Sequence, residues 1–445
     1  MSFYKIVISD LHLADGHAVL DGFGNRQQSA LEGLLSSSAG LGNAGNNSYG
    51  KAGDIELIMN GDCFDFLAVP PYMMEEVIDP GTAVEKLEKI IAVHEPFFAA
   101  LRRFVAQPGQ HVTFISGNHD VELGFAEVRE RIREAIGAAD GIDFCLTRSY
   151  RPLPDVEIEH GHQHDFWNAA HGLWDEKGEP IAVRPTALRL PLGTQYFQRA
   201  AFPMSIQYPY FDHFEPSMDL MRQIAMLSLL NPALVMETAR RSMQMLSYAR
   251  AASAGANQDG GPQVLFEEAM QDFVAFAQDM AARRPEWQKL PEDESARAEQ
   301  MAQFFRLRQA LQEPLAEAIA AICVPGVYPM GEDVARGMQA VLANDPRLRY
   351  VIAGHTHMLR HDRVNGGTQV YLNTASWTPR YALPTAQEIT PQLLEWLRQP
   401  DWNAVPLRDV TQMVFAVIET EEDQPSHASL RMWEGGIDGH YRILN

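Results

Sequence analysis

Five predicted strands each end in a cluster of polar side chains, and this pattern constrains the fold more than any other feature of the chain. Each apolar run, rich in β-branched residues, stops at an Asp, Asn or His that in most cases stands next to a glycine. The clusters are Ser9-Asp10-Leu11-His12, Asn60-Gly61-Asp62, Ser116-Gly117-Asn118-His119-Asp120, His160-Gly161-His162 and Gly354-His355-Thr356-His357. Groups held at strand ends of a layered α/β core are rigidly placed and open to solvent, as a catalytic metal site requires.

Length and charge limit the classes of protein to consider. The chain has 445 residues, more than one compact core holds, so we expect one large domain with an insertion, or two domains. Its net charge of −22 argues against nucleic acid as the main partner, because a polyanion-binding surface needs a basic patch. A small phosphorylated substrate remains allowed, since bound divalent cations would reverse the field locally.

The cysteines and the apolar stretches predict a cytoplasmic location. Cys63, Cys145 and Cys323 are far apart and odd in number, which is typical of reduced thiols rather than a disulfide framework. The N-terminus enters a strand almost at once, without the pattern of a signal peptide. The most apolar stretch, 224–236, is interrupted by polar residues and a proline and is too short to span a bilayer. No obligate protein partner is indicated.

Alternating strand and helix patterns predict an α/β core in two halves. The expected helices are 26–35, 82–105 with a kink or break at Pro96, 124–136 and 331–342, and the expected strands of the tail are 369–372, 413–418 and 428–433. We expect the tail strands to form a second sheet packed on the first. Segment 36–53 is dominated by Ser, Gly, Asn and Ala and is expected to be a surface loop.

The chain between His160 and His355 is far longer than a connection within one core requires. Most of it has helical periodicity. We therefore interpret 166–325 as a mostly helical insertion or cap, placed between a first core half at 1–165 and a second at 326–445.

The insertion carries an aromatic segment, 196–220, that admits two interpretations. The simpler one is an interdomain core. The other is a cap over the metals that offers an apolar wall to a lipid or aromatic group. In that case Arg184, Arg189 and Arg199 could meet a second phosphate of the substrate.

The polar clusters, taken in chain order, resemble the motifs of the calcineurin-like metallophosphoesterase superfamily. The matching residues are Asp10-x-His12, Gly61-Asp62 with Asp65, Gly117-Asn118-His119-Asp120, His160-Gly161 and Gly354-His355-x-His357. The resemblance covers about residues 1–165 and 326–445. It implies a four-layer αββα sandwich core, here with the large helical insertion. It also implies a two-metal-dependent phosphoesterase that hydrolyses a phosphomonoester or phosphodiester by attack of a metal-bridging hydroxide.

The resemblance further implies two metal sites that share one carboxylate. One ion would be held by Asp10, His12, Asp62 and His357, and the other by Asp62, Asn118, His160 and His355. Imidazole and carboxylate together suit Mn, Fe, Zn or Co better than calcium, and manganese is the expected ion. Two such cations about 3.5–4 Å apart share and acidify a water and clamp the phosphoryl oxygens for in-line attack.

Two more residues of the motifs are expected to be catalytic. In the family pattern His119 protonates the leaving oxygen, and Asp65 holds that imidazole in orientation and favours its charged form. The simpler alternatives are that His119 stabilises a turn and that Asp65 caps the following helix. His162, His164 and Asp165 either fix the ligand rings or face solvent. Asn373 and Trp377 are expected to pack near the site rather than to line it.

Part of the resemblance points to a narrower group. Ile8-Ser9-Asp10-Leu11-His12-Leu13 and Asn373-Thr374-Ala375-Ser376-Trp377 look like segments of bacterial UDP-2,3-diacylglucosamine pyrophosphatases. A nucleotide-lipid pyrophosphatase, with peripheral membrane contact through the insertion, is therefore the alternative function. The chain departs from that group in its longer helical middle and in having Asp65 where those enzymes tend to carry glutamate. The substrate of that group is therefore not assigned to this chain.

Two other classes are disfavoured by the sequence. A nuclease of the same superfamily would need a basic tract, which the strongly negative charge does not supply. Some members of the fold are non-catalytic scaffolds for protein binding, and these have generally lost ligands or the acid histidine. Here the set is complete.

Overall fold

The computed structural model divides the chain into two compact units. The first is Met1–Gln195, Asp333–Thr378 and Thr411–Asn445, and the second is Tyr196–Glu332 and Pro379–Val410. The residues described are 2–16, 21–36, 54–70, 77–137, 140–165, 167–182, 184–196, 198, 208, 213–215, 330–382, 388, 390–402, 404–421 and 424–444. The expected loop at 36–53 and most of the expected insertion at 166–325 lie outside them, so their structure stays a prediction. All nine predicted metal-binding and catalytic residues lie in the first unit.

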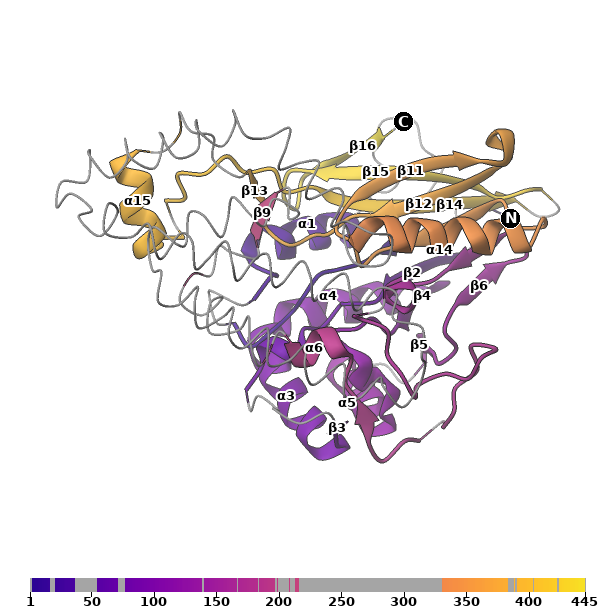
Figure 1. The fold of residues 1–445 in the computed structure, drawn as a ribbon, viewed down its shortest axis with the longest axis horizontal. Helices are drawn as coiled ribbons and strands as arrows, with labels where there is room; N and C mark the ends of the chain where they lie inside the picture. Colours follow the sequence, from indigo (N-terminus) through magenta and orange to yellow (C-terminus); the bar gives the residue numbers. More distant parts are fainter. Residues whose placement is uncertain are drawn as a thin grey trace, which may run out of the picture. The chain divides into compact units, whose positions relative to one another are not determined.

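The larger sheet has seven strands in the order β16-β15-β14-β1-β2-β4-β5 (Figure 1). The strands are β1 (Ser2–Ile8), β2 (Asp54–Asn60), β4 (Gln110–Ile115), β5 (Ile142–Cys145), β14 (Met413–Glu421), β15 (His427–Glu434) and β16 (His440–Leu444). β1, β2, β4 and β5 are parallel to one another, whereas β14, β15 and β16 continue the sheet in antiparallel fashion. The strands predicted before Asp10, Asp62 and Asn118 are therefore confirmed, and the structure shows that they are neighbours in this sheet.

The smaller sheet has five strands in the order β11-β12-β10-β7-β6. They are β6 (Tyr150–Leu153), β7 (Val156–Ile158), β10 (Tyr350–Ala353), β11 (Leu359–Val364) and β12 (Gln369–Thr374). β7, β10 and β12 are parallel, and antiparallel β6 and β11 form the two edges. The second half of the chain thus contributes to both sheets.

The prediction that the tail strands form a second sheet is wrong for two of them. We expected 413–418 and 428–433 to belong to a second sheet, but β14 pairs with β1 and β15 pairs with β14 in the first sheet. The reason lies in β14, which is apolar on both faces: Phe415 packs into the core on the helix side, and Val414 packs into the core between the sheets. A strand buried on both faces fits the interior of a covered sheet.

Helices and the second sheet cover the two faces of the larger sheet. Val7, Ile58 and Ile115 of the larger sheet pack against Ile352 and Leu372 of the smaller one. The opposite face of the larger sheet is covered by α1 (Asn25–Ser36), α3 (Pro80–Val93), α4 (Glu95–Val105) and α5 (Ala126–Ile136). Helix α14 (Met330–Asn344) packs on the smaller sheet (Figure 1). The chain is therefore of the α/β class, as expected.

The helix expected at 82–105 is two helices. α3 ends at Val93 and α4 begins at Glu95, with Pro96 in the first turn of α4. Proline is tolerated there because the first-turn amides have no partner inside a helix. The aspartate before α3, Asp79, caps that helix by accepting from the amide of Thr82 at 3.0 Å.

The remaining described elements are small. The first unit also has the two-stranded pair of β3 (Val77–Ile78) and β8 (Leu188–Arg189), and helix α6 (Leu192–Tyr196). In the second unit β9 (Phe214–Glu215) pairs with β13 (Tyr381–Ala382), and α15 is Pro391–Arg398. None of the helices in the described ranges has the length and apolar character needed to cross a bilayer.

Candidate metal centre

The polar clusters meet where the parallel strands of both sheets end. Asp10 follows β1 and donates its amide to Gly61 O at 3.1 Å, just after β2. In the smaller sheet, Gly354 after β10 donates its amide to His160 O at 3.0 Å, after β7. The two sheets are joined by the amide of His355, which lies 3.0 Å from Asp10 Oδ2. The loops of both sheets therefore form one site.

Five of the seven predicted ligands have a left-handed backbone. The φ angles are 56° at Asp10, 53° at His12, 49° at Asp62, 68° at His355 and 57° at His357. A non-glycine residue in this region costs roughly 1–3 kcal/mol and persists only where its surroundings enforce it. Such strain is found preferentially at functional sites, where it fixes the direction of side chains.

Two buried carboxylates form the centre of the site. Asp10 and Asp62 are 0% and 1% exposed. His357 Nε2 lies 3.2 Å from Asp10 Oδ1, and His160 Nε2 lies 3.1 Å from Asp62 Oδ2. His12 Nε2 lies 4.0 Å from an oxygen of each carboxylate. The imidazoles thus link the two carboxylates into one cluster.

The imidazoles keep both carboxyl groups ionised. Burial raises the pKa of Asp10, but the neighbouring His357 more than offsets this and the net shift is downward. Burial likewise raises the pKa of Asp62, and His160 and His119 bring it well below its ordinary value. Two negative charges therefore persist in the interior at neutral pH, which is the condition for holding divalent cations.

The side chains fall into groups that could hold metal ions. One group is Asp10, His12 and His357, another is Asp62, His160 and His355, and in each the ligand atoms lie within 4.8 Å of one another. Asn118 is 3% exposed, and its Oδ1 accepts no hydrogen bond within the described part of the chain. These are the donor types expected from the sequence, although the assignment of one ion to each group stays a prediction.

In three of the imidazoles, one ring nitrogen lies within hydrogen-bond distance of an oxygen of the protein. The contacts are His12 Nδ1 to Asp65 Oδ2 at 3.2 Å, His160 Nδ1 to Asn60 O at 2.7 Å, and His355 Nε2 to Asp165 Oδ2 at 3.1 Å. Metal-binding histidines are commonly fixed in this way, because the hydrogen bond sets the tautomer and leaves the second nitrogen as the ligand. At His160 that second nitrogen, Nε2, is buried and lies 3.1 Å from Asp62 Oδ2, on the side of the two carboxylates. The residues present therefore fit divalent metal ions.

Glycines in the clusters allow the loops to approach closely. A Cβ atom added at Gly117 would overlap the carboxylate of Asp62, and one added at Gly61 would overlap the ring of His160. One added at Gly354 would meet the side chain of Asp10. The glycines next to the polar residues are required because side chains from other loops occupy this space.

His119 and Asp65 lie together beside the carboxylates. His119 Nδ1 is 3.1 Å from Asp65 Oδ1, and the His119 side chain is 25% exposed. Asp65 also accepts from the amides of Leu67 and Ala68 at the start of η2 (Phe66–Ala68). Both expectations for Asp65 are therefore met by the geometry: it caps the following turn and it contacts the imidazole. It also contacts His12, which was not expected.

The environment of His119 favours its protonated form. Burial by itself lowers the pKa of the imidazole, but Asp65 and Asp62 outweigh this effect and raise it to about 10. In the metal-free protein the ring therefore carries a proton at neutral pH. With Nδ1 facing Asp65, Nε2 is the nitrogen left to interact with a substrate.

His162, His164 and Asp165, which follow β7, were expected either to fix the ligand rings or to face solvent. Asp165 hydrogen-bonds the ring of His355, as a group fixing a ligand would. His162 is 2% exposed, and burial together with His160 lowers its pKa well below the ordinary value, so it is a neutral packed residue. His164 instead lies 3.1 Å from Glu159. Only Asp165 of these three hydrogen-bonds a predicted ligand.

Sequence reasoning missed the role of Asp120. Its carboxylate is 0% exposed and accepts from the amides of Gly117 at 2.6 Å and Cys63 at 2.9 Å, joining the loops after β4 and β2. Burial, followed by repulsion from Asp62, raises its pKa to about 7. The available signal was its place beside His119 in the motif. Asn373 and Trp377 are structural, as expected: Asn373 holds Gly354 O at 2.7 Å.

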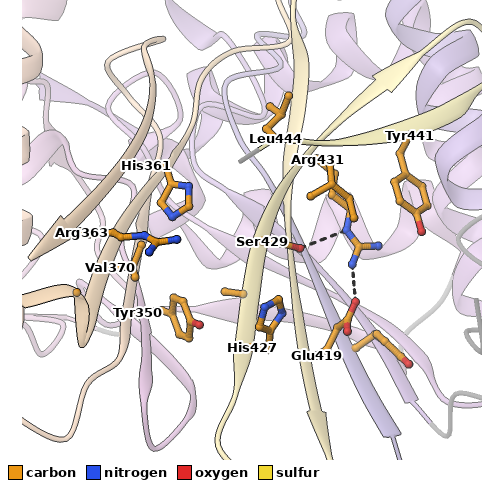
Figure 2. Close-up of a pocket in the computed structure, with 14 residues that line it drawn as sticks. Tyr350, His361, Arg363, Val370, Glu419, His427, Ser429, Arg431, Tyr441 and Leu444 are labelled. Atoms are coloured by element: carbon orange, nitrogen blue, oxygen red, sulfur yellow. Dashed lines mark hydrogen bonds and ion pairs between the residues drawn. The ribbon is translucent and has the colours of Figure 1, made fainter.

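A separate pocket of about 660 Å³ lies at the opposite ends of the strands (Figure 2). Figure 2 shows His361 and Arg363 on one side and Arg431 with Glu419 on the other. These residues do not share a face. Cross-strand partners lie on one face of a sheet, so Arg431, opposite Phe415, belongs to the helix side of the larger sheet. His361, opposite Leu372, lies on the inter-sheet face of the smaller sheet, where its side chain is exposed at the edge. The charges therefore do not converge on one ligand.

Comparison with known proteins adds no assignment. No known family model matches the chain, and no significant match is found among curated proteins. Of the arginines considered for the cap, Arg184 makes an exposed ion pair with Glu130 at 3.4 Å, and Arg199 lies outside the described residues. The role of the cap stays a prediction.

A buried carboxylate near the site predicts a pH-dependent stability. Glu122 in η3 (Val121–Gly124) is 1% exposed, and burial, only partly offset by Lys86, raises its pKa from 4.5 to about 7. Because the folded-state pKa is raised, its contribution to stability is present below about pH 4.5 and is lost as the pH rises through 7. The loss is on the order of 3 kcal/mol, at 1.36 kcal/mol per pKa unit.

Denaturant unfolding of the wild type and Glu122→Gln at pH 5 and pH 8 checks this prediction. The unfolding free energy of the variant minus that of the wild type is expected to be more positive at pH 8 than at pH 5, because glutamine cannot ionise. A difference in unfolding free energy that is the same at both pH values would contradict the account. Glu127→Gln is the matched control, because Glu127 lies in the first turn of α5 and is exposed.

Proposed function

We propose that the chain is a two-metal phosphoesterase of the calcineurin-like metallophosphoesterase superfamily, with that family's four-layer αββα core. One observation carries the proposal: the two buried carboxylates of Asp10 and Asp62 lie in groups with four imidazoles, and an oxygen hydrogen-bonds the second ring nitrogen of three of those imidazoles. The two packed sheets, each with helices on its outer face, support the proposed architecture. The resident ions are proposed to be manganese.

We assign the metal ligands according to the two groups of side chains described above. Asp10, His12, Asp62 and His357 would hold one cation, and Asp62, Asn118, His160 and His355 would hold the other. When bound, two divalent cations supply Lewis-acid polarisation of the phosphoryl group and activation of the attacking water. Asp62 is the shared ligand, which is supported by the positions of His12 and His160 near its carboxylate.

The remaining chemistry belongs to His119 and Asp65. An ester oxygen leaves as a poor, strongly basic group unless a proton reaches it as the bond to phosphorus breaks. His119, which contacts Asp65 through Nδ1 and is a quarter exposed, is proposed to donate that proton from Nε2. Asp65, in contact with Nδ1, holds the ring in orientation and stabilises its charged form.

Hydrolysis of p-nitrophenyl phosphate and bis(p-nitrophenyl) phosphate with added manganese tests the proposal. We expect turnover of at least one ester, lost on chelation and restored by manganese, and the ratio of the two rates assigns the protein as a mono- or diesterase. Glu88→Gln, which changes an exposed carboxylate paired with Arg131, should turn over like the wild type. Turnover of neither ester by folded, manganese-loaded protein would count against the proposal.

A further inference from the structure

A buried lysine lies behind the proposed catalytic pair. Lys86 of α3 is 0% exposed, and its Nζ donates to the carbonyl oxygen of Phe66 at 2.9 Å. Burial lowers the pKa of this amine, while the nearby carboxylates of Glu122 and Asp65 act in the opposite direction. Taking an ammonium group out of water is costly unless its surroundings compensate. An apolar side chain of similar length would fill the same space without that cost.

Phe66, whose carbonyl oxygen accepts from Lys86, connects Asp65 and His119. Phe66 directly follows Asp65, and its amide donates to the carbonyl oxygen of His119 at 3.2 Å. The same peptide segment carries the amides of Leu67 and Ala68, which bind Asp65 Oδ1. The turn η2 is therefore bonded to Asp65, to His119 and, through Lys86, to helix α3.

Lys86 also interacts electrostatically with the segment after His119. Glu122 lies three residues beyond His119, and neither of its carboxylate oxygens has a hydrogen-bond partner within the described ranges. Its charge and that of Lys86 act on each other in the interior. Lys86 thus interacts with the Asp65 turn through a hydrogen bond and with the His119 segment through charge.

We propose that Lys86 is a positioning residue that fixes the Asp65 turn against the His119 segment, so that the imidazole is aimed at the leaving oxygen. The inference rests on the proposed phosphoesterase function and adds a residue to it. Within the described part of the chain, Lys86 hydrogen-bonds Phe66 O and interacts with the charges of Glu122 and Asp65, not with those of Asp10 or Asp62. Its loss should therefore weaken proton donation without weakening metal binding.

The test compares two esters that differ in leaving group. Phenyl phosphate needs a proton donor more than p-nitrophenyl phosphate does, because phenolate is the more basic leaving group. Lys86→Met keeps the length of the side chain and removes the donor. We expect kcat on phenyl phosphate to fall roughly 10–100-fold, as for other residues that support catalytic groups. On p-nitrophenyl phosphate the fall should be much smaller, with KM and manganese affinity unchanged.

Lys89→Met is the matched control, since Lys89 lies on the same helix, is exposed, and donates to Pro70 O rather than to the catalytic turn. It should behave as wild type on both esters. If Lys86→Met does not fold, Lys86→Met/Glu122→Gln removes both buried charges and should show the same selective loss. Equal losses on the two esters, or none, would overturn the inference alone. Turnover by the wild type of neither these monoesters nor bis(p-nitrophenyl) phosphate would overturn the proposed function together with it.

Discussion

Replacing Asp62 with alanine is expected to abolish both metal binding and turnover. The carboxylate lies 3.1 Å from His160 Nε2 and 4.0 Å from His12 Nε2, so its loss affects both proposed ion sites at once. Two-metal activation contributes several kcal/mol of transition-state stabilisation. We therefore expect manganese-dependent turnover to fall by at least ~10³-fold, at about 1.4 kcal/mol for each factor of ten. Bound manganese, measured by elemental analysis after dialysis, should fall with it.

The same substitution also removes a structural contact, and the design has to separate the two effects. Asp62 Oδ1 accepts from the amide of His119 at 2.8 Å, so Asp62→Asn is a useful second variant that keeps an oxygen in this position. Asp62→Asn should fold and yet lose manganese. A variant that kept both ions and wild-type turnover would contradict the proposed role of Asp62.

Replacing His119 is expected to lower turnover without releasing the metal ions. Because His119 is proposed to donate a proton and not to bind metal, His119→Gln should retain both manganese ions while kcat falls by roughly 10²–10⁴, the usual contribution of a general acid. The loss should be larger for phenyl phosphate than for p-nitrophenyl phosphate. Steady-state kinetics on the two esters, with elemental analysis of the same samples, checks both halves of the prediction.

His111→Gln provides the comparison for this experiment. His111 lies on β4, before the same loop, and its side chain is 36% exposed near Glu56. We expect it to leave kcat and metal content unchanged. Loss of manganese from His119→Gln would show that His119 is a ligand instead, and equal losses on the two esters would argue against proton donation.

The local features of this site were predictable from sequence. A run such as Ile55-Glu56-Leu57-Ile58-Met59 has the composition of a buried strand, and the polar residues that follow it must lie at the strand end. Once several such strands are parallel, their ends share one edge, so the meeting of Asp10, Asp62 and Asn118 follows from short segments alone. The strand-end position of these residues needed no knowledge of the distant chain.

The sheet that each strand joins could not be predicted from its own segment. β7 and β14 are both buried strands, yet β7 joins the smaller sheet and β14 joins the larger one. That choice depends on which faces are already covered, a property of the assembled core and not of the segment. The supporting roles of Asp120 and Lys86 were missed for a related reason, because their partners lie 57 and 20 residues away along the chain.

Anomalous diffraction from crystals grown with manganese, measured above and below the manganese absorption edge, locates the bound ions. We expect two anomalous peaks about 3.5–4 Å apart, as in other two-metal sites, with the carboxylate of Asp62 contacting both. Ions found only elsewhere on the molecule, or no peak among these side chains at saturating manganese, would contradict the account.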